Sequence, residues 1–504
     1  MQAFLDGMLE VVKVINTYFS NYILIFLLVG VGLYYSIRTK FVQVRCFGEG
    51  MKNVFGNIKL KGDKNKSGMS SFQALATAVA AQVGTGNVVG ACGAILVGGP
   101  GAIFWMWIIA FLGMATIYAE ATLAQKTRVT NPDGTVEGGP IYYIKTAFKG
   151  KFGKFLAVFF SIAAVFALGF VGAMVQSNSI ASNFANMFSS FNVNASFEFA
   201  GLTLNWVSII TGLFCAIMAG FVLMGGTQRL ASVTEKLVPV MAAFYIVGGL
   251  FVLCINIKYI PETFGMIFKY AFNAQALIGG GFGSAIVLAI RKGAQRGLFS
   301  NEAGMGSTPH AHALANVKDP HTQGTCAMIG VFIDTFIVLT MTALVVISSL
   351  YTEANPLITI TPENYAAYNA IEGFSANMAQ HAFSGAFAKL FGESVGNMIG
   401  STFVAVCLFF FAFSTILGWN YFGKVNFTHL FGKKSTLVYS IIAVVFVFLG
   451  SVLKNDLVWE LTDLFNYLMV LPNVIALFAL GGLVVSMTKF GKKKDELPEI
   501  KENK

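Results

Sequence analysis

The sequence predicts an all-α polytopic membrane protein with about eleven transmembrane helices. Hydrophobic residues make up 56% of the 504 residues and charged residues only 12%, whereas a soluble protein carries roughly a quarter of charged residues to wet its surface. The mean hydropathy is +0.69. The apolar runs are long and continuous, which is typical of helical spans and not of the alternating strands of a membrane barrel.

The same composition excludes several classes of protein. A soluble enzyme and a disordered chain are both incompatible with so few charges, and so is a nucleic-acid-binding protein, although the net charge is +10. The six cysteines are scattered and show no CxxC spacing, so we expect neither disulfides nor a zinc site. The N-terminus lacks the basic start of a signal peptide, and we therefore expect the first helix to remain in the mature protein.

A span requires about 20 apolar residues, and eleven segments qualify. They lie near 15–37, 70–97, 101–125, 153–182, 204–226, 233–257, 264–298, 322–350, 396–421, 435–453 and 459–487. From these we expect an extra N-terminal helix, a basic interfacial segment, two five-helix repeats and a basic tail. Their bounds are 1–37, 38–69, 70–257, 258–487 and 488–504, with an extracellular loop at 351–395 inside the second repeat.

The basic residues indicate the topology. Lys and Arg gather in 38–66, in 126–154 and in the C-terminal tail, whereas 183–203 has none and 351–395 has only Lys389. Loops rich in Lys and Arg remain in the cytoplasm. With an odd number of spans, we expect the N-terminus outside and the C-terminus in the cytoplasm, in the cell (inner) membrane. The positive charge therefore reports orientation in a lipid bilayer and not a nucleic-acid partner.

Two spans contain glycine clusters, at 80–87 and at 279–284. Glycine in a helix interior costs about 1 kcal/mol relative to alanine, and backbone groups that it frees cannot face lipid. Close helix packing through small residues is one explanation for each cluster alone. However, each cluster opens a block of five spans, as expected for two structural repeats. Interrupted helices at corresponding positions of two halves indicate the binding site of a transporter, and an odd number of spans per repeat makes the second repeat inverted.

Several motifs make the sequence similar to a known family. They are VGTGN at 83–87, GPGA at 99–102 with Trp105, EGGP at 137–140, NEAGMGS at 301–307, Asp334-Thr335, STILGW at 414–419 and LPN at 471–473. Together they resemble the alanine or glycine:cation symporter family (sodium:alanine symporters), within the superfamily of the leucine-transporter fold. The resemblance covers about 70–485. It implies a leucine-transporter-like fold, with one extra N-terminal helix and a 5+5 inverted repeat.

The first break is the candidate substrate site. Unwinding at Gly84–Gly86 frees backbone N–H groups at the start of a half-helix, where the helix dipole favours a carboxylate. The resemblance places carboxylate binding on the amides of Thr85 and Gly86. Gln82 is expected to reach the substrate or to hold the unwound chain. Asn87 either supplies an oxygen ligand to a cation or only caps the second half-helix.

The seventh span offers the complementary feature. Gly281, Phe282 and Gly283 are expected to expose carbonyl groups to the substrate ammonium, with the Phe282 ring closing over a small side chain; simple packing is the alternative for this ring. Gln176 lies inside a long apolar span, where an unpaired amide is costly, and is a further candidate for the pocket.

Sodium prefers oxygen ligands, as other hard cations do. Ser414 and Thr415 place two adjacent hydroxyls in an apolar helix, where such hydroxyls often bond only to their own helix. The resemblance implies a sodium site formed by the carbonyls of Ala80 and Val83 with the side chains of Ser414 and Thr415, and Thr415 is also a substrate candidate. Trp419, one turn further, either lines the cavity or belongs to an interfacial aromatic belt.

The remaining intramembrane polar residues have alternative explanations. Asp334, Glu120 and Asp463 are either functional acids or structural partners of basic residues. The histidines at 310, 312 and 321 lack cysteines or acids at ligand spacing, so we do not expect a metal there. We expect them to lie in a cytoplasmic loop that contributes to an inner gate.

The resulting expectation is a sodium-coupled symporter that imports a small neutral amino acid, alanine or glycine, by alternating access. A proton-coupled carrier using Asp334 or Glu120 is the main alternative, followed by a passive channel and a membrane-embedded enzyme. The sequence has no glycine-rich phosphate loop of the GxxxxGK[ST] kind, so ATP-driven pumping is not expected. No cofactor is expected beyond the coupling ion. The sequence leaves the oligomeric state open.

Overall fold

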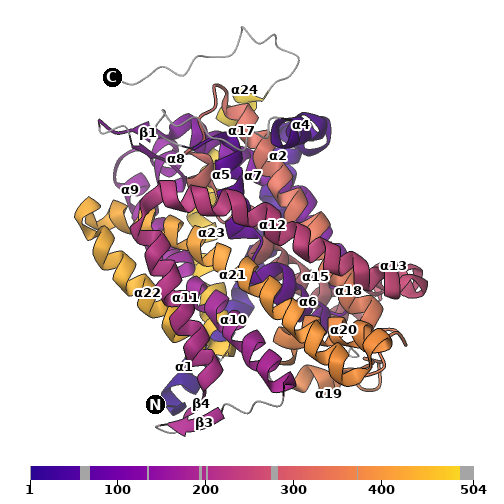
Figure 1. Cartoon of the computed structure of the whole chain (residues 1–504). Coiled ribbons are helices and arrows are strands. Elements are labelled where there is room, and N and C mark those ends of the chain that lie inside the picture. The colour runs from indigo at the N-terminus through magenta and orange to yellow at the C-terminus, as the bar shows by residue number, and fades with distance from the viewer. Residues whose placement is uncertain are drawn as a thin grey trace.

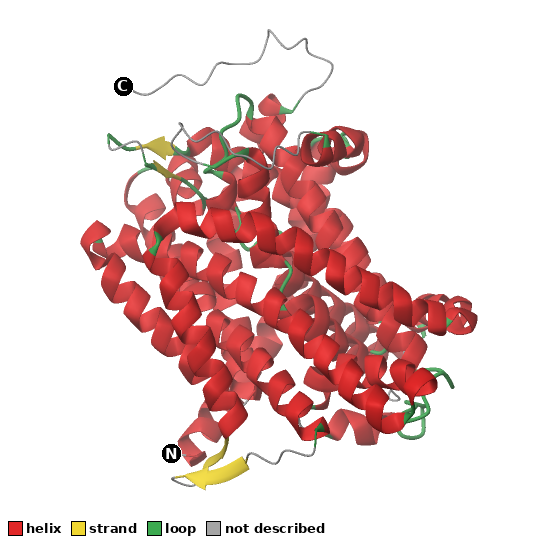
Figure 2. Cartoon of the chain, viewed as in Figure 1, coloured by secondary structure: helices red, strands yellow, loops and turns green. Residues whose placement is uncertain are grey.

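The computed structural model describes residues 2–56, 69–132, 135–191, 196–199, 202–273, 282–371, 373–453 and 455–488. These residues form helices almost throughout (Figure 2). Two short antiparallel hairpins are the exception. In one, β1 (Val129–Thr130) pairs with β2 (Val136–Glu137), and in the other β3 (Ser196–Phe199) pairs with β4 (Leu202–Asn205).

The N-terminal part of the chain is helical across the segment where an extra N-terminal helix is expected. The extra helix consists of α1 (Gln2–Phe19), the π-helical η1 (Ser20–Leu24) and α2 (Ile25–Arg38). Two short helices follow, α3 (Val42–Arg45) and α4 (Phe47–Phe55). α4 packs against α17, so this segment is anchored to the helical bundle.

The first group of helices begins with a broken span. Its parts are α5 (Ser71–Gln82), η2 (Gly86–Gly90) and α6 (Ala91–Gly98). Ser70 caps α5 through a reciprocal capping box with Gln73, which fixes where this helix begins. The other elements of this group are α7 (Ala102–Thr127), α8 (Pro140–Ala147), α9 (Gly150–Ala164), η3 (Val165–Phe170), α10 (Val171–Ser190), α11 (Trp206–Met224) and α12 (Gly226–Ile255).

The second group begins with short elements and ends with long helices. It starts with η4 (Ile257–Tyr259), α13 (Ile260–Phe272), α15 (Phe282–Asn301) and α16 (Pro309–His312). A second span follows as α17 (Pro320–Val331), η5 (Phe332–Leu339) and α18 (Thr340–Leu350). The rest comprises α19 (Tyr365–Ala370), α20 (Phe374–Phe391), α21 (Glu393–Phe431), η6 (Lys433–Ser435), α22 (Thr436–Val452), α23 (Asn455–Ala479) and α24 (Gly481–Met487).

The described helices account for ten of the eleven predicted spans. Nine helical segments are long and apolar enough to cross a membrane, and α5 with η2–α6 makes a tenth span that bends by 47°. The predicted span at 264–298 corresponds to α13 and α15, neither of which meets this test in the described part. α15 fails the test because it carries three charged residues, Arg291, Lys292 and Arg296.

The two ends of the bundle differ in the elements they carry. α4, β1 and α24 lie at one end, and the β3–β4 hairpin lies at the opposite end with the start of α1 (Figure 1). α19 lies toward the same end as this hairpin (Figure 1). The predicted outer loop 351–395 contains α19 and the mostly buried α20, which packs along α21. Much of the segment expected as an extracellular loop is therefore packed into the helical bundle.

Candidate functional site at two helix breaks

The first break separates α5 from η2 at Val83–Thr85. Val83 leaves the helical conformation (φ −77°, ψ 89°), which interrupts the backbone ladder. Asn87 holds the opened turn, because its Oδ1 accepts a hydrogen bond from the Gly84 N–H at 2.9 Å. Its Nδ2 donates to the carboxylate of Asp334 at 2.6 Å. The structure thus gives Asn87 a holding role, and its role as a cation ligand stays a prediction.

The two glycines of this break let other helices approach closely. A methyl group added at Gly84 would collide with Oγ1 of Thr415 on α21, and one added at Gly86 would lie 2.9 Å from Cα of Ser300 on α15. Both glycines are buried. The break therefore lies in direct contact with two other helices, as a site between structural units requires.

A second break lies between α15 and α16. Three residues in this segment have positive φ angles, Glu302 (59°), Gly304 (94°) and Gly306 (81°). A non-glycine residue in this conformation costs on the order of 1–3 kcal/mol and is typical of functional sites. Here Glu302 donates its N–H to the Leu298 carbonyl at 2.9 Å and is completely buried.

The interruption expected at 279–284 is a different segment, between α13 and α15, and most of it lies outside the described residues. Of the predicted cluster, Gly281 lies outside the described residues, while Phe282 and Gly283 belong to the first turn of α15, which runs without a break to Asn301. The described break therefore follows α15 and uses the NEAGMGS motif. In this motif the positive φ angles, and not the density of glycines, mark where the helix ends.

Hydrogen bonds connect the first break to the second and to α10. Nε2 of Gln82 donates to the Asn301 carbonyl at 2.8 Å, and Oε1 of Gln176 accepts from the Thr85 N–H at 3.2 Å. Four other polar atoms of these residues are buried and lack a protein partner in the described part of the chain: Gln82 Oε1, Thr85 Oγ1, Gln176 Nε2 and Asn301 Nδ2. Buried polar atoms without partners are costly, so these groups are suited to a polar ligand.

The hydroxyls of α21 meet the end of α5. Ser414 Oγ lies 3.2 Å from the Ala80 carbonyl oxygen, and Thr415 Oγ1 lies 3.0 Å from the same oxygen and 3.5 Å from that of Val83. Both hydroxyls also contact the Phe411 carbonyl of their own helix. Oxygen atoms from two helices thus converge beside the first break, at the residues predicted to bind sodium.

Trp419 connects α21 to the second break. Its Nε1–H donates to one carboxylate oxygen of Glu302, and Ser307 donates its hydroxyl to the other. The Trp419 ring meets the Phe299 ring edge-on at 5.5 Å. Only 1% of the Trp419 surface is exposed, which excludes a place in an interfacial aromatic belt.

Glu120 forms a third link to the second break. Its carboxylate accepts from the Gly304 N–H at 3.1 Å and from Asn473 Nδ2 at 2.6 Å. Asn473 also donates to the Gly304 carbonyl at 2.9 Å. The LPN motif on α23 therefore holds the unwound segment, with Asn473 on one side and Glu120 of α7 on the other.

The other two intramembrane acids have different surroundings. Asp334 accepts hydrogen bonds from Asn87, Ser300 and Thr335, at 2.6–2.9 Å, and its described hydrogen bonds involve no basic loop residue. Asp463 instead pairs with Arg296 at 3.3 Å and accepts from Gln295 at 2.6 Å. Asp463 is therefore a structural partner between α15 and α23, whereas Asp334 belongs to the surroundings of the first break.

The structure thus brings most of the predicted site residues together. The residues around the first break, Gln176, the two hydroxyls and Trp419 lie in one connected network. Sequence reasoning missed the side chains of Ser300, Asn301, Glu302 and Asn473 as parts of it. For the last three the signal was present in the NEAGMGS and LPN motifs, which were family signatures without a physical role, whereas Ser300 lies just outside them.

This fold and site define a class of secondary transporter. The structure resembles the crystal structure of MhsT in complex with L-phenylalanine, with a TM-score of 0.52, 13% identity and coverage of 85% of this chain and 91% of that chain. At this identity the likeness shows the fold, which is the predicted leucine-transporter-like fold. The sequence profile of the Sodium:alanine symporter family matches residues 5–503. The chain therefore belongs to the sodium:alanine symporter family.

Named relatives agree with this assignment. The chain is 38% identical over 481 residues to the sodium/alanine symporter AgcS of Methanococcus maripaludis, covering 95% of this chain and 96% of the relative. It is 36% identical over 467 residues to the amino-acid carrier protein AlsT of Bacillus subtilis, covering 92% and 88%. It is 35% identical over 481 residues to the probable sodium/glutamine symporter GlnT of the same organism, covering 95% and 90%. The protein is thus an integral membrane amino-acid:cation symporter and not an enzyme.

Proposed function

We propose that this protein imports alanine or glycine together with sodium. One observation carries the ion assignment. The carbonyl oxygens of Ala80 and Val83 converge with the hydroxyl of Thr415 at 3.0 and 3.5 Å, beside the first break. Hard oxygen ligands of this kind suit a small alkali cation. The relative named a sodium/alanine symporter supports the same choice.

The unpaired polar atoms near the two breaks support an amino-acid substrate. Gln176 Nε2, Asn301 Nδ2 and the Thr85 hydroxyl can donate to a carboxylate, and Gln82 Oε1 can accept from an ammonium group. A zwitterion at membrane depth needs both kinds of partner. In this proposal Phe299 and Trp419, packed edge-to-face, restrict the substrate to a small side chain.

The transport cycle follows from the contacts between the two breaks. Sodium binds between α5 and α21, and the amino acid then bridges the first break, the second break and Gln176. Rocking of one bundle against the other exposes both ligands to the cytoplasm. Coupling arises because both ligands stabilise the same closed arrangement, so each raises the affinity for the other by the same factor.

The proposed orientation has the N-terminus outside. The basic segments that contain α4 and α8 lie at the same end of the bundle as α24, opposite the β3–β4 hairpin (Figure 1). Loops with this excess of Lys and Arg remain in the cytoplasm. Labelling of a cysteine introduced in the β3–β4 hairpin of intact cells by an impermeant maleimide tests this orientation.

Proton coupling is the second candidate. Its supporting observation is that Glu120, Glu302 and Asp334 are completely buried and that their described side-chain hydrogen bonds come from neutral groups. A buried acid without a cationic partner is the kind of group that carries a proton. In the sodium-coupled proposal these acids have a structural role at the two breaks.

Uptake into proteoliposomes separates the candidates. Labelled alanine, glycine and glutamine are offered under an imposed sodium gradient or an imposed proton gradient. We expect alanine and glycine to accumulate with the sodium gradient alone. Accumulation with a proton gradient in sodium-free buffer would establish proton coupling, equilibration without accumulation would establish a channel, and a preference for glutamine would overturn the substrate assignment.

A further inference from the structure

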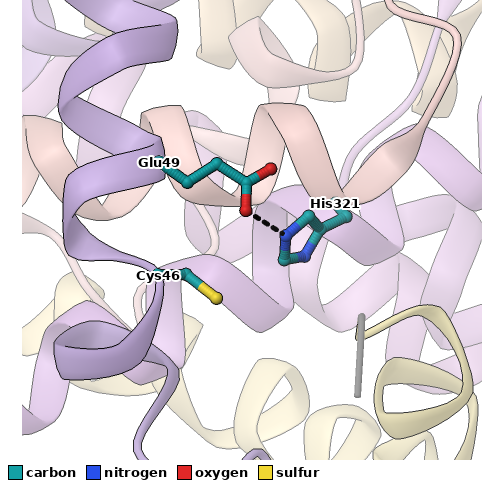
Figure 3. A group of neighbouring side chains, drawn as sticks. All are labelled: Cys46, Glu49 and His321. Atoms are coloured by element: carbon teal, nitrogen blue, oxygen red, sulfur yellow. Dashed lines mark hydrogen bonds and ion pairs between the residues drawn. The ribbon is translucent and has the colours of Figure 1, made fainter. Parts of the chain in front are cut away.

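A second group of chemically reactive side chains lies away from the two breaks, near α24. Cys46 immediately precedes α4, Glu49 lies in the first turn of α4, and His321 lies in the first turn of α17. The potential ligand atoms of the three residues all lie within 4.8 Å of one another. Figure 3 shows the Glu49 carboxylate directed at the His321 imidazole ring and the Cys46 thiol pointing away from its helix toward the same ring. The sequence gives no sign of this group, because α4 and α17 are remote in the chain.

The contact between α4 and α17 is close enough to preform this arrangement. A methyl group added at Gly50 would lie 2.8 Å from the Thr325 carbonyl oxygen, so the two helices touch through backbone atoms. Asn53 Nδ2 donates to Thr325 Oγ1 at 3.0 Å, and the Phe47 ring meets the Phe332 ring edge-on at 4.9 Å. The three side chains are therefore held together by packing that does not depend on any ligand.

The surroundings of His321 can accept the ring proton at the nitrogen that points away from the cluster. Its Nδ1 lies 2.6 Å from the Tyr118 hydroxyl, which lies 3.4 Å from Thr488 Oγ1 and donates to it. Thr488 in turn donates its own proton to the Val484 carbonyl at 3.0 Å. Without a metal, Nε2 donates its proton to the Glu49 carboxylate at 3.3 Å. When a metal takes the place of this proton, the chain of hydroxyls can accept the ring proton at Nδ1. A hydrogen-bonded second ring nitrogen is the usual arrangement of a histidine that binds a metal.

We propose that Cys46, Glu49 and His321 bind one Zn²⁺ ion. Thiolate, imidazole and carboxylate together are characteristic ligands of zinc, whereas calcium and magnesium take oxygen ligands. With metal–ligand bonds of about 2.0–2.2 Å, a tetrahedral site separates an oxygen from a nitrogen ligand by about 3.4 Å. The observed 3.3 Å between Glu49 Oε2 and His321 Nε2 already matches this separation.

The proposed site is open on one side. The Glu49 side chain is 40% exposed, while the His321 side chain is fully buried. A water molecule can therefore supply the fourth ligand, and the thiol proton of Cys46 leaves to solvent when the metal binds. Bound zinc would tether α4 to α17, which continues through η5 to Asp334.

Metal titration of the purified full-length protein tests the proposal. The chelator-treated protein is titrated with Zn²⁺ by calorimetry and with Co²⁺ by absorption, since a thiolate bound to cobalt gives a charge-transfer band in the near ultraviolet. We expect one equivalent of either metal to bind, the thiolate band to appear, and saturating zinc to raise the unfolding temperature.

Three variants and one control make the test decisive. Cys46→Ser should abolish the thiolate band, and Glu49→Gln and His321→Gln should each weaken zinc binding at least about tenfold. Glu49→Gln changes a partly exposed side chain, so it keeps the test valid if another variant fails to fold. Cys254→Ser, at the exposed cysteine outside the cluster, should change nothing. Less than one equivalent bound, a band that persists in Cys46→Ser, or equal zinc affinity in Glu49→Gln and wild type would overturn the site.

Discussion

The side chain of Asn87 binds Asp334 twice. Its Nδ2 lies 2.6 Å from the Asp334 carboxylate and 3.1 Å from the Asp334 carbonyl oxygen. Because Asn87 Oδ1 simultaneously accepts from the Gly84 N–H, one amide joins the opened turn of the first broken helix to η5. The geometry of the break therefore depends on a residue of another span.

Replacement of Asp334 should distinguish a structural acid from a proton carrier. Asp334→Ala removes the carboxylate that accepts from Asn87, Ser300 and Thr335 and leaves only the Asp334 carbonyl oxygen to Asn87. Each buried donor that loses its acceptor costs about 1–3 kcal/mol. We expect alanine uptake to fall more than about tenfold in this variant. Asp334→Asn should retain sodium-driven uptake, because the two hydroxyls can rotate to accept from the new amide. Well-folded Asp334→Asn protein without uptake would indicate that the charge itself is required.

The glycines of the first break should not tolerate alanine. Gly84→Ala would place a methyl group against Thr415 and Gly86→Ala would place one 2.9 Å from Cα of Ser300. Overpacking of this kind costs about 1–3 kcal/mol, so we expect uptake to fall about tenfold or more. Gly93→Ala, which has open space around it on α6, is the matched control. Equal uptake in all three variants would contradict the close contact of the break with α15 and α21.

Thr415→Ala should weaken the dependence on sodium. It removes one of the hydroxyl oxygens that face the Ala80 and Val83 carbonyls, and an interaction with a charged group is worth about 1.5–3 kcal/mol. We expect the sodium concentration for half-maximal uptake to rise about tenfold or more, with Thr415→Ser close to wild type. The control is Thr428→Ala on the same helix, whose hydroxyl contacts only carbonyls of that helix in its described hydrogen bonds. An unchanged sodium requirement in Thr415→Ala would remove this residue from the ion site.

The stability of the contact between Glu302 and Trp419 should depend on an acceptor oxygen at this position and not on the negative charge of the acid. Glu302→Gln can keep its oxygen toward the indole N–H and turn its amide toward Ser307, whose hydroxyl can accept. Glu302→Ala leaves the buried indole N–H without an acceptor, at a cost of about 1–3 kcal/mol. We expect Glu302→Ala to unfold at a clearly lower temperature than wild type. Glu302→Gln should unfold close to the wild-type temperature. A double-mutant cycle with Trp419→Phe should give a coupling of about 1–3 kcal/mol, and additive effects would contradict the contact.

Gln176→Ala should weaken binding of the amino acid more than binding of sodium. The substitution removes the acceptor of the Thr85 N–H and the unpaired amide proposed to meet the carboxylate. We expect KM for alanine to rise about tenfold while the sodium concentration for half-maximal uptake changes little. Asn186→Ala, on the same helix but bonded to Gln380, should leave both values unchanged. A rise in the sodium requirement alone would assign Gln176 to the ion site instead.

Local sequence rules indicated the first break but left close helix packing as an alternative. Val83–Gly84–Thr85 interrupts a run of small apolar residues, and a helix interior with this composition has little propensity to continue. The proximity of Ser414 and Thr415 to Ala80 came from the family resemblance. The geometry agrees with it because Ala81 and Gly418 are small enough for α5 and α21 to approach closely. A methyl group added at Gly418 would lie 3.0 Å from Cβ of Ala81.

The second break and the cluster of Cys46, Glu49 and His321 could not be derived in this way. The glycine cluster at 279–284 lies mostly outside the described residues, and glycine density there says nothing of the break at Glu302, whose positive φ angle accompanies contacts with Trp419, Ser307 and Leu298. Cys46 and His321 likewise share no sequence motif. Both features arise from tertiary contacts, which a pattern along the chain does not contain.

The hydrogen bond from Gln82 to the Asn301 carbonyl joins the two interrupted helices directly. If either helix withdraws by more than about 1 Å, this buried amide loses its partner at a cost of about 1–3 kcal/mol. Thermodynamic coupling between two binding sites is typically also 1–3 kcal/mol. A single hydrogen bond of this strength is thus comparable to the whole coupling free energy of a proposed ion and amino acid, so one amide between the two breaks is sufficient to offset it.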